Sequence, residues 1–161
     1  VVHPDDFSRF SKLNIIASME PAHAVEDMPW AIDRVGNERV LGAYAWRTLR
    51  KNNGTVIFNS DFTGSDPSFF YAVYSAITKK KKGEEKAYFP EQAFTKEESL
   101  RAYTIWAAYT SQQEKLTGTI EVGKWADFTF IDVDVLNASP QEILNGSVLK
   151  TIVNGKIAYE K

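Results

Sequence analysis

Hydrophobic positions along the first half of the chain change repeatedly between strand-like runs and helical spacing. Short apolar runs predict strands at residues 14–19 and 55–60, and helical spacing predicts helices at 4–13, 41–49 and 66–77. Proline and aspartates mark the start of the first helix and of the last. This α-β-α-β-α order favours parallel strands joined by crossover helices.

A charged segment, residues 79–94, separates this region from the next helix. Its four consecutive lysines predict a solvated loop. The alternative is an anion-binding patch, and the adjacent Glu84 and Glu85 argue against it. Helical order resumes at Thr95, which forms a capping-box pattern with Glu98. The aromatic residues of the helix that follows, Tyr103, Trp106 and Tyr109, recur at helical spacing, which favours packing over a stacking platform for a ligand.

The last part of the chain has a different pattern. Residues 126–134 alternate as a strand does, and 148–161 form two strands joined by Asn154-Gly155, a strong hairpin signal. Ser139-Pro140 opens a short helical turn between them. The pattern predicts a small β module after an α/β region.

Composition excludes several classes of function. The 161 residues are 43% hydrophobic and 25% charged, which is typical of about one globular domain. A net charge of −2 and a pI near 5.7 give no electrostatic reason to expect nucleic acid or an anionic membrane as a partner. The absence of cysteine removes disulfides, thiolate metal ligands and a cysteine nucleophile.

Candidate chemistry is sparse, because GxGxxG, P-loop, GxSxG and HExxH motifs are all absent. Asp61 follows a core strand, so its carboxylate must be solvated, paired or bound to a metal. An Asx-type turn is the structural alternative for this segment. His23 also follows a strand, where parallel α/β folds place functional groups, although a hydrogen-bonded loop histidine is an equal alternative. His3 precedes a helix and is interpreted as a solvated or capping residue.

Four segments together resemble one known family. They are IIASMEPAHAVEDMPWAIDRVGNERVLGAYAWRTL, IFNSDF, YFPEQAFTKEESLRAYTIWAAYTSQQEKLTGTIEVGKWADFTFID and VNGKIAY. In order and spacing they closely resemble the C-terminal part of metal-dependent amidohydrolases, in the branch that includes N-substituted formamide deformylase and exoenzyme regulatory proteins. That family has a (β/α)8 TIM barrel, a β-sandwich built from both chain ends, and one or two divalent metals, commonly zinc.

The resemblance implies an α/β fold class in which this chain is the last part of the barrel. Residues 14–19 match the seventh barrel strand and 55–60 match the eighth. We therefore expect residues 1–118 to be the C-terminal segment of the TIM barrel, and 119–161 to be the C-terminal portion of a small β-sandwich.

The resemblance also implies roles for individual residues. Asp61 matches the aspartate after strand eight, which in the family contacts the metal and takes the proton of the attacking water. His23 matches a histidine expected to contact substrate or an oxyanion. Asp27 and Trp30 are expected to line the substrate pocket. Glu20 stands where relatives usually have glutamine, a change that alters the polarity near the substrate.

The other metal ligands of the family match positions upstream of Val1. They are a His-x-His after strand one and histidines after strands five and six. We therefore expect a divalent metal, zinc, in the full-length enzyme, none tightly bound by this chain alone, and no activity of the isolated chain. The expected function is hydrolysis of a carbon–nitrogen bond in a small-molecule, non-peptide amide. The alternative is a non-catalytic binding or self-association domain with an amidohydrolase-derived fold. Because two parallel strands leave unpaired edges, we expect homo-oligomers or association with the missing barrel portion.

Overall fold

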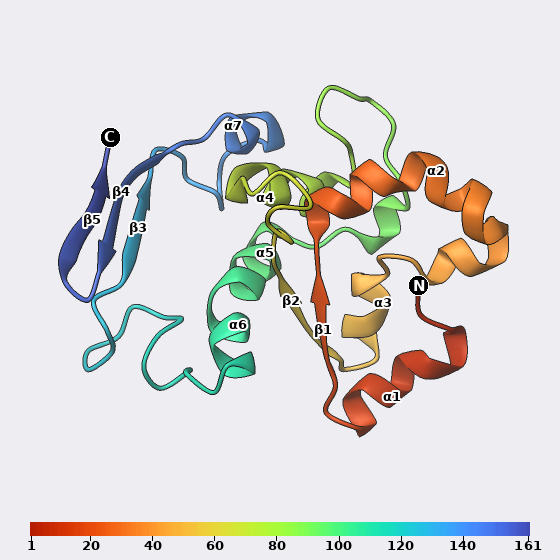
Figure 1. The fold of residues 1–161 in the computed structure, drawn as a ribbon, viewed down its shortest axis with the longest axis horizontal. Coiled ribbons are helices and arrows are strands. Elements are labelled where there is room, and N and C mark those ends of the chain that lie inside the picture. The colour runs from red at the N-terminus through yellow and green to blue at the C-terminus, as the bar shows by residue number, and fades with distance from the viewer.

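The computed structural model describes all 161 residues, as an α/β body followed by a small antiparallel sheet (Figure 1). Strands β1 (Ile16–Met19) and β2 (Thr55–Phe58) lie side by side and run parallel, with Ile16 opposite Thr55 and Met19 opposite Phe58. The predicted α/β class and the two predicted strands are confirmed. These two strands form a sheet of their own, so each has one unpaired edge.

Helices cover the β1–β2 pair and connect its strands. The α-helices are α1 (Phe7–Lys12), α2 (Pro21–Arg39), α3 (Trp46–Lys51), α4 (Phe69–Thr78), α5 (Lys96–Tyr103), α6 (Ile105–Thr110) and α7 (Pro140–Leu144). Short 3₁₀ helices are η1 (Pro4–Asp6), η2 (Val40–Gly42) and η3 (Pro90–Gln92). None of the helices has both the length and the apolar character needed to cross a membrane.

Helix α2 corrects the sequence prediction, which placed a loop after the first strand. Pro21, which follows the end of the strand, occupies the first turn of a 19-residue helix. Proline is tolerated there because its missing N–H would have no partner within the helix. Pro29 lies inside the helix, and Gly36, with φ of 78°, marks a kink near its end.

Capping signals in the sequence predicted the starts of helices correctly. The capping box predicted between Thr95 and Glu98 is present in both directions at the start of α5. The helix predicted to continue from there is broken at Thr104, whose φ of −121° and ψ of −98° are not helical, so α5 and α6 are separate. Ser68 caps α4 by accepting a hydrogen bond from the Tyr71 amide.

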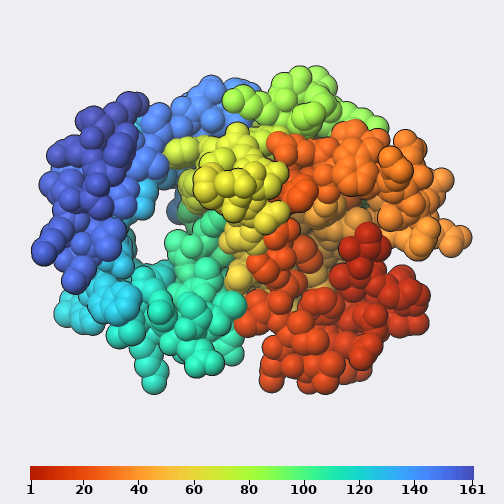
Figure 2. All heavy atoms as spheres, viewed as in Figure 1, coloured from red at the N-terminus to blue at the C-terminus, as the bar shows by residue number.

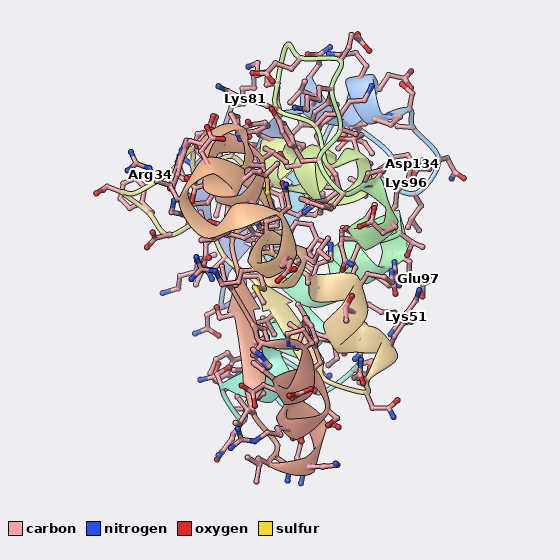
Figure 3. The ribbon with its side chains drawn as sticks, turned by 90° about the vertical axis from the view of Figure 1, so that its right-hand side faces the viewer. Arg34, Lys51, Lys81, Lys96, Glu97 and Asp134 are labelled. Carbon is pink, nitrogen blue, oxygen red and sulfur yellow. The ribbon has the colours of Figure 1, made fainter.

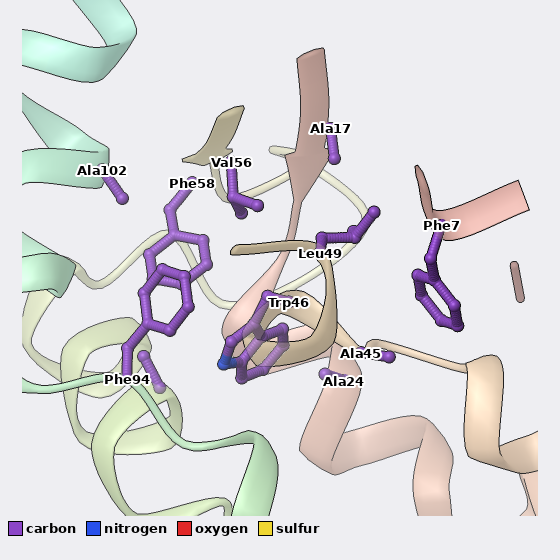
Figure 4. Close-up of a cluster of buried hydrophobic side chains, with 11 residues drawn as sticks. Phe7, Ala17, Ala24, Ala45, Trp46, Leu49, Val56, Phe58, Phe94 and Ala102 are labelled. Atoms are coloured by element: carbon purple, nitrogen blue, oxygen red, sulfur yellow. The ribbon is translucent and has the colours of Figure 1, made fainter. Parts of the chain in front are cut away.

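The main hydrophobic core lies between the strand pair and the helices around it (Figure 4). Trp46 meets Phe58 edge to face, with ring centroids 5.6 Å apart, and Phe94 lies 5.2 Å from Phe58. Tyr103 and Trp106 pack against this cluster, which confirms that they serve packing. Such aromatic contacts add about 1 kcal/mol each beyond the area they bury.

Lys79 corrects the prediction that all four lysines of the run are solvated. Its side chain has no exposed surface, and Nζ lies 3.6 Å from the centre of the Trp46 ring without a hydrogen-bond partner. Burial lowers the pKa of Lys79 to about 7, and the charge of Glu91 opposes this shift only in part. Lys81, by contrast, lies on the outer loop (Figure 3), with Nζ 3.6 Å from Glu84.

The C-terminal sheet has the strand order β3 (Phe128–Ile131), β4 (Val148–Val153), β5 (Lys156–Glu160), all antiparallel. The hairpin predicted at Asn154-Gly155 is confirmed. The predicted helical turn is α7, which Ser139 opens with a capping box.

One lysine and one cavity mark the boundary between this sheet and the α/β body. Lys96 Nζ, at the start of α5, donates to the carbonyls of Leu136 and Ala138, and it lies near Asp134 in Figure 3. A cavity of about 820 Å³ separates α5 and α6 from the sheet, and the space-filling view shows an opening there (Figure 2). The domain boundary at 118/119 stays a prediction.

Candidate functional site

The carboxyl ends of β1 and β2 meet at the same edge of the sheet, and polar side chains gather there. Asn59, directly after β2, donates through Nδ2 to Ser18 Oγ at 2.6 Å and to Glu20 Oε1 at 2.8 Å. One amide group therefore joins the ends of both strands. Glu20 is one of its two acceptors.

Asp61 occupies a tight turn that begins at Asn59. The Asn59 side-chain carbonyl accepts a hydrogen bond from the Asp61 amide at 2.8 Å, which is the Asx-type arrangement considered for this segment. The Asp61 backbone is left-handed, with φ of 48°. A Cβ atom at Gly64 would lie 2.7 Å from Asp61 Oδ2 and 3.0 Å from the Asp61 carbonyl oxygen, so glycine leaves room for the carboxylate in its present position. The turn and the functional acid are thus compatible, because the turn is made by Asn59 and leaves the Asp61 carboxylate free.

His23 lies in the first turn of α2 and faces this carboxylate. His23 Nδ1 is 3.9 Å from Asp61 Oδ2, and the imidazole is about one-third exposed. On its other side, His23 Nε2 is 3.4 Å from Asp27 Oδ2, one helical turn further along α2. The four-residue spacing places both side chains on one helix face. The structure therefore brings together three of the four residues expected at the site.

Tyr44 is a member of this group that the sequence analysis missed. Its hydroxyl donates to Asp27 Oδ2 at 2.5 Å. Burial raises the pKa of Tyr44, and the adjacent Asp27 carboxylate raises it further. The hydroxyl thus stays protonated and acts as a donor. Tyr44 falls within the helix predicted at 41–49, but in the structure it lies between η2 and α3, and this place brings its hydroxyl to Asp27.

Trp30, the fourth expected residue, does not join these contacts. Its side chain lies on α2, about half exposed, and no hydrogen bond links it to Asp27 or His23. His3 is also separate, because its Nδ1 accepts the Asp5 amide and caps η1. The capping role considered for His3 is confirmed.

The side chains gathered at this edge of the sheet were tested as a set of metal ligands. Protein zinc sites use three or four ligands that converge on one point, whereas the carboxylates of Asp61 and Asp27 face different nitrogens of the His23 ring. No group of three or more histidine, aspartate or glutamate side chains in the structure is arranged to hold a metal ion.

Polar groups at the carboxyl ends of parallel strands are typical of α/β enzymes. Residues 1–159 match the amidohydrolase family, so the chain belongs to that family, as the sequence resemblance indicated.

Curated relatives agree with this assignment. YtcJ of Bacillus subtilis (strain 168), named as an amidohydrolase, is 30% identical over 155 residues, which are 95% of this chain and 29% of that protein. Protein LONG AFTER FAR-RED 3 of Arabidopsis thaliana is 27% identical over 97% of this chain and 27% of its own length. N-substituted formamide deformylase of Arthrobacter pascens is 38% identical over 72 residues, which are 45% of this chain and 13% of the enzyme. The chain thus spans less than a third of these relatives.

Solved structures show the same fold. An uncharacterized metal-dependent hydrolase from Pyrococcus horikoshii OT3 superposes with a TM-score of 0.76 at 26% identity, covering 88% of this chain and 29% of that one. Its Pyrococcus furiosus counterpart gives 0.72 at 26% identity, covering 85% and 27%. A zinc-bound adenosine deaminase from Xanthomonas campestris, 18% identical with a TM-score of 0.69 over 99% of this chain and 35% of its own, shares the fold alone.

Proposed function

We propose that this chain is the C-terminal segment of a metal-dependent hydrolase that cleaves a carbon–nitrogen bond in a non-peptide amide. In this proposal β1 and β2 are strands seven and eight of a (β/α)8 barrel, and β3 to β5 belong to its β-sandwich. The similarity to N-substituted formamide deformylase favours N-substituted formamides as the substrate class.

One observation carries the proposal. The Asp61 carboxylate stands at the carboxyl end of the second parallel strand, more than half exposed and 3.9 Å from His23 Nδ1. In barrel enzymes, catalytic groups come from the ends of several strands on this face. Gly64 and Asn59 shape the turn so that the carboxylate projects from it.

In the proposed reaction Asp61 accepts the proton of the attacking water and returns it to the leaving amine. A bound divalent cation, zinc in this proposal, would supply an acidified water at neutral pH. Its other ligands would come from the rest of the barrel, so the isolated chain is inactive. His23 contacts the substrate at the same face.

Metal analysis tests this assignment. The purified chain, alone and assembled with the preceding barrel portion of the gene product, is analysed for zinc and for formate release from N-substituted formamides. We expect stoichiometric zinc and activity only in the assembly, and loss of both in Asp61→Asn. Asp66→Asn is the matched control, because Asp66 accepts the Ser68 amide in the next turn and lies outside the site.

Two results would contradict the proposal. Tight, stoichiometric zinc that depends on Asp61 in the chain alone would show that the site is complete without the barrel. Full activity of the Asp61→Asn assembly would remove Asp61 from the reaction.

Unpaired strand edges favour association with a partner as a second part of the proposal. β1 and β2 pair only with each other, and every residue of β5 is exposed. We propose that the missing barrel portion, or a second copy of the chain, covers these edges. Light scattering is expected to show a dimer or larger species for the chain alone and a 1:1 complex when the barrel portion is added. A chain that stays monomeric and does not bind the barrel portion would refute this.

A further inference from the structure

Four polar side chains form one continuous row across the candidate site. The Tyr44 hydroxyl donates to Asp27 Oδ2 at 2.5 Å, and the same oxygen lies 3.4 Å from His23 Nε2. His23 Nδ1 then faces Asp61 Oδ2 at 3.9 Å. Exposure rises along the row, since the side chains of Asp27, His23 and Asp61 are 17%, 34% and 59% exposed. The row therefore runs from the protein interior to the open edge of the sheet.

The inner end of the row is held firmly by the backbone. Tyr44 has a φ of 49°, a left-handed conformation that costs a non-glycine residue of its kind about 1 kcal/mol or more. It persists because the neighbouring segment is fixed, with the Ala43 amide bonded to the Val40 carbonyl and the Val2 amide to the Gly42 carbonyl. The tyrosine ring packs against two hydrophobic clusters, so its hydroxyl has a fixed position.

The groups that face the two ring nitrogens favour one position for the imidazole proton. Asp27 is an acceptor, and its Oδ2 receives the Tyr44 hydroxyl on one side. His23 Nε2 lies 3.4 Å from the same oxygen, and its interaction with the carboxylate is favourable only when Nε2 carries a proton. A neutral imidazole with Nε2 protonated has an unprotonated Nδ1.

We infer that Asp27 and Tyr44 are positioning residues that hold His23 as the Nε2–H tautomer, so that its Nδ1 is presented to the site as a hydrogen-bond acceptor. The inference rests on the proposed function and deepens it. Asp27 acts through His23 and not through direct contact with substrate.

This arrangement defines what His23 recognises. Nδ1 and the Asp61 carboxylate are both acceptors, and at 3.9 Å they are too far apart for a direct hydrogen bond. A molecule with two donor hydrogens, such as water or an amine, fits between them and donates one hydrogen to each. His23 therefore orients the attacking water or the leaving amine, and a neutral His23 does not stabilise an oxyanion.

Side-chain nitrogen NMR on the ¹⁵N-labelled full chain tests the inference without metal or substrate. The chain has only two histidines, so exposed His3 is an internal reference. At a fixed pH of about 9, where a free imidazole is neutral, His23 is expected to be entirely the Nε2–H tautomer. Asp27→Asn removes the negative charge that faces Nε2, and it is expected to shift His23 from the Nε2–H form alone to a mixture of the two tautomers. Tyr44→Phe removes the donor that holds the Asp27 carboxylate in place, and it is expected to give a mixture of the two tautomers.

Tyr71→Phe is the matched control, because Tyr71 packs against the same helix through Ala22 and Val25 but touches no member of the row. It should leave the His23 tautomer unchanged. Tyr44→Phe keeps the ring and the packing, so it reports on the inference even if Asp27→Asn does not fold. A wild-type His23 in the Nδ1–H form, or a tautomer unaffected by Asp27→Asn and Tyr44→Phe in folded protein, overturns the inference. These spectra do not depend on catalysis, whereas failed zinc binding in the assembly would count against the proposed function alone.

Discussion

Lys79 makes the stability of this chain depend on pH in an unusual direction. The perturbation is Lys79→Met, which keeps an unbranched side chain of similar length over the Trp46 ring but removes the ammonium. Because Lys79 Nζ is completely buried without a hydrogen-bond partner, its charged form is poorly tolerated in the folded state. Removing the ammonium is therefore expected to stabilise the protein at neutral pH.

The size of the effect follows from the pKa of Lys79, which is 10.5 ordinarily and about 7 in the folded chain. At about 1.4 kcal/mol for each tenfold change in proton affinity, this fall corresponds to roughly 5 kcal/mol. Below pH 7 both the folded and unfolded states carry the charge, so the full cost is present. Between pH 7 and 10.5 only the unfolded state binds the proton, and the free energy of unfolding therefore rises with pH. Above pH 10.5 neither state carries the charge, so the free-energy cost of burying it is absent.

Urea unfolding followed by tryptophan fluorescence measures this dependence at pH values of about 6 to 9.5. The Lys79→Met variant should exceed wild type by a few kcal/mol at pH 6 and 7, and the gap should narrow steadily above pH 7. Lys81→Met, in the same lysine run but on the outer loop, is the control and should follow the wild-type curve. A constant gap across this pH range, or a less stable Lys79→Met at pH 7, would refute the reasoning.

Two further predictions concern stability elsewhere in the chain. Hydrogen bonds from Arg47 lower the pKa of Glu98 to about 2, so its stabilising contribution is present above pH 4.5 and lost as the pH falls through 2. Glu98→Gln should lower the free energy of unfolding at pH 7 by about 2 kcal/mol in urea titrations, whereas Glu97→Gln, which removes an exposed pair, should change it by less than about 0.5 kcal/mol. Gly42→Ala would place a Cβ 1.9 Å from the Val2 carbonyl oxygen, and thermal unfolding should show a loss of about 2 to 4 kcal/mol. An unchanged melting temperature would show that the N-terminal segment is not fixed against Gly42.

Local sequence signals predicted a large part of the fold because their physics acts within a few residues. The Thr95–Glu98 capping box and the Asn154-Gly155 turn each depend on neighbouring backbone groups, and both are present as predicted. Local signals did not predict helix α2, which begins at Pro21. Proline both ends a strand and begins a helix, and Pro29 within the following segment concealed the helical pattern.

Long-range contacts explain what the sequence could not predict about the site. Asp61 and His23 were identified by their places after strands, which is a topological rule of parallel sheets. The contact between Tyr44 and Asp27 spans 17 positions and depends on where η2 ends, so no local pattern reveals it. Lys79 was misplaced for the same reason, because its burial is caused by Trp46, which is distant in sequence.

The single Asn59 amide between Ser18 and Glu20 has an evolutionary consequence. An amide with two donor hydrogens requires an acceptor at both other positions, so the three residues can change only together, and double substitutions among them should be strongly non-additive. Glutamate at position 20 meets this requirement as an acceptor and carries a negative charge, which a glutamine would not. The Glu20 carboxylate therefore both joins the two strand ends and places a negative charge there.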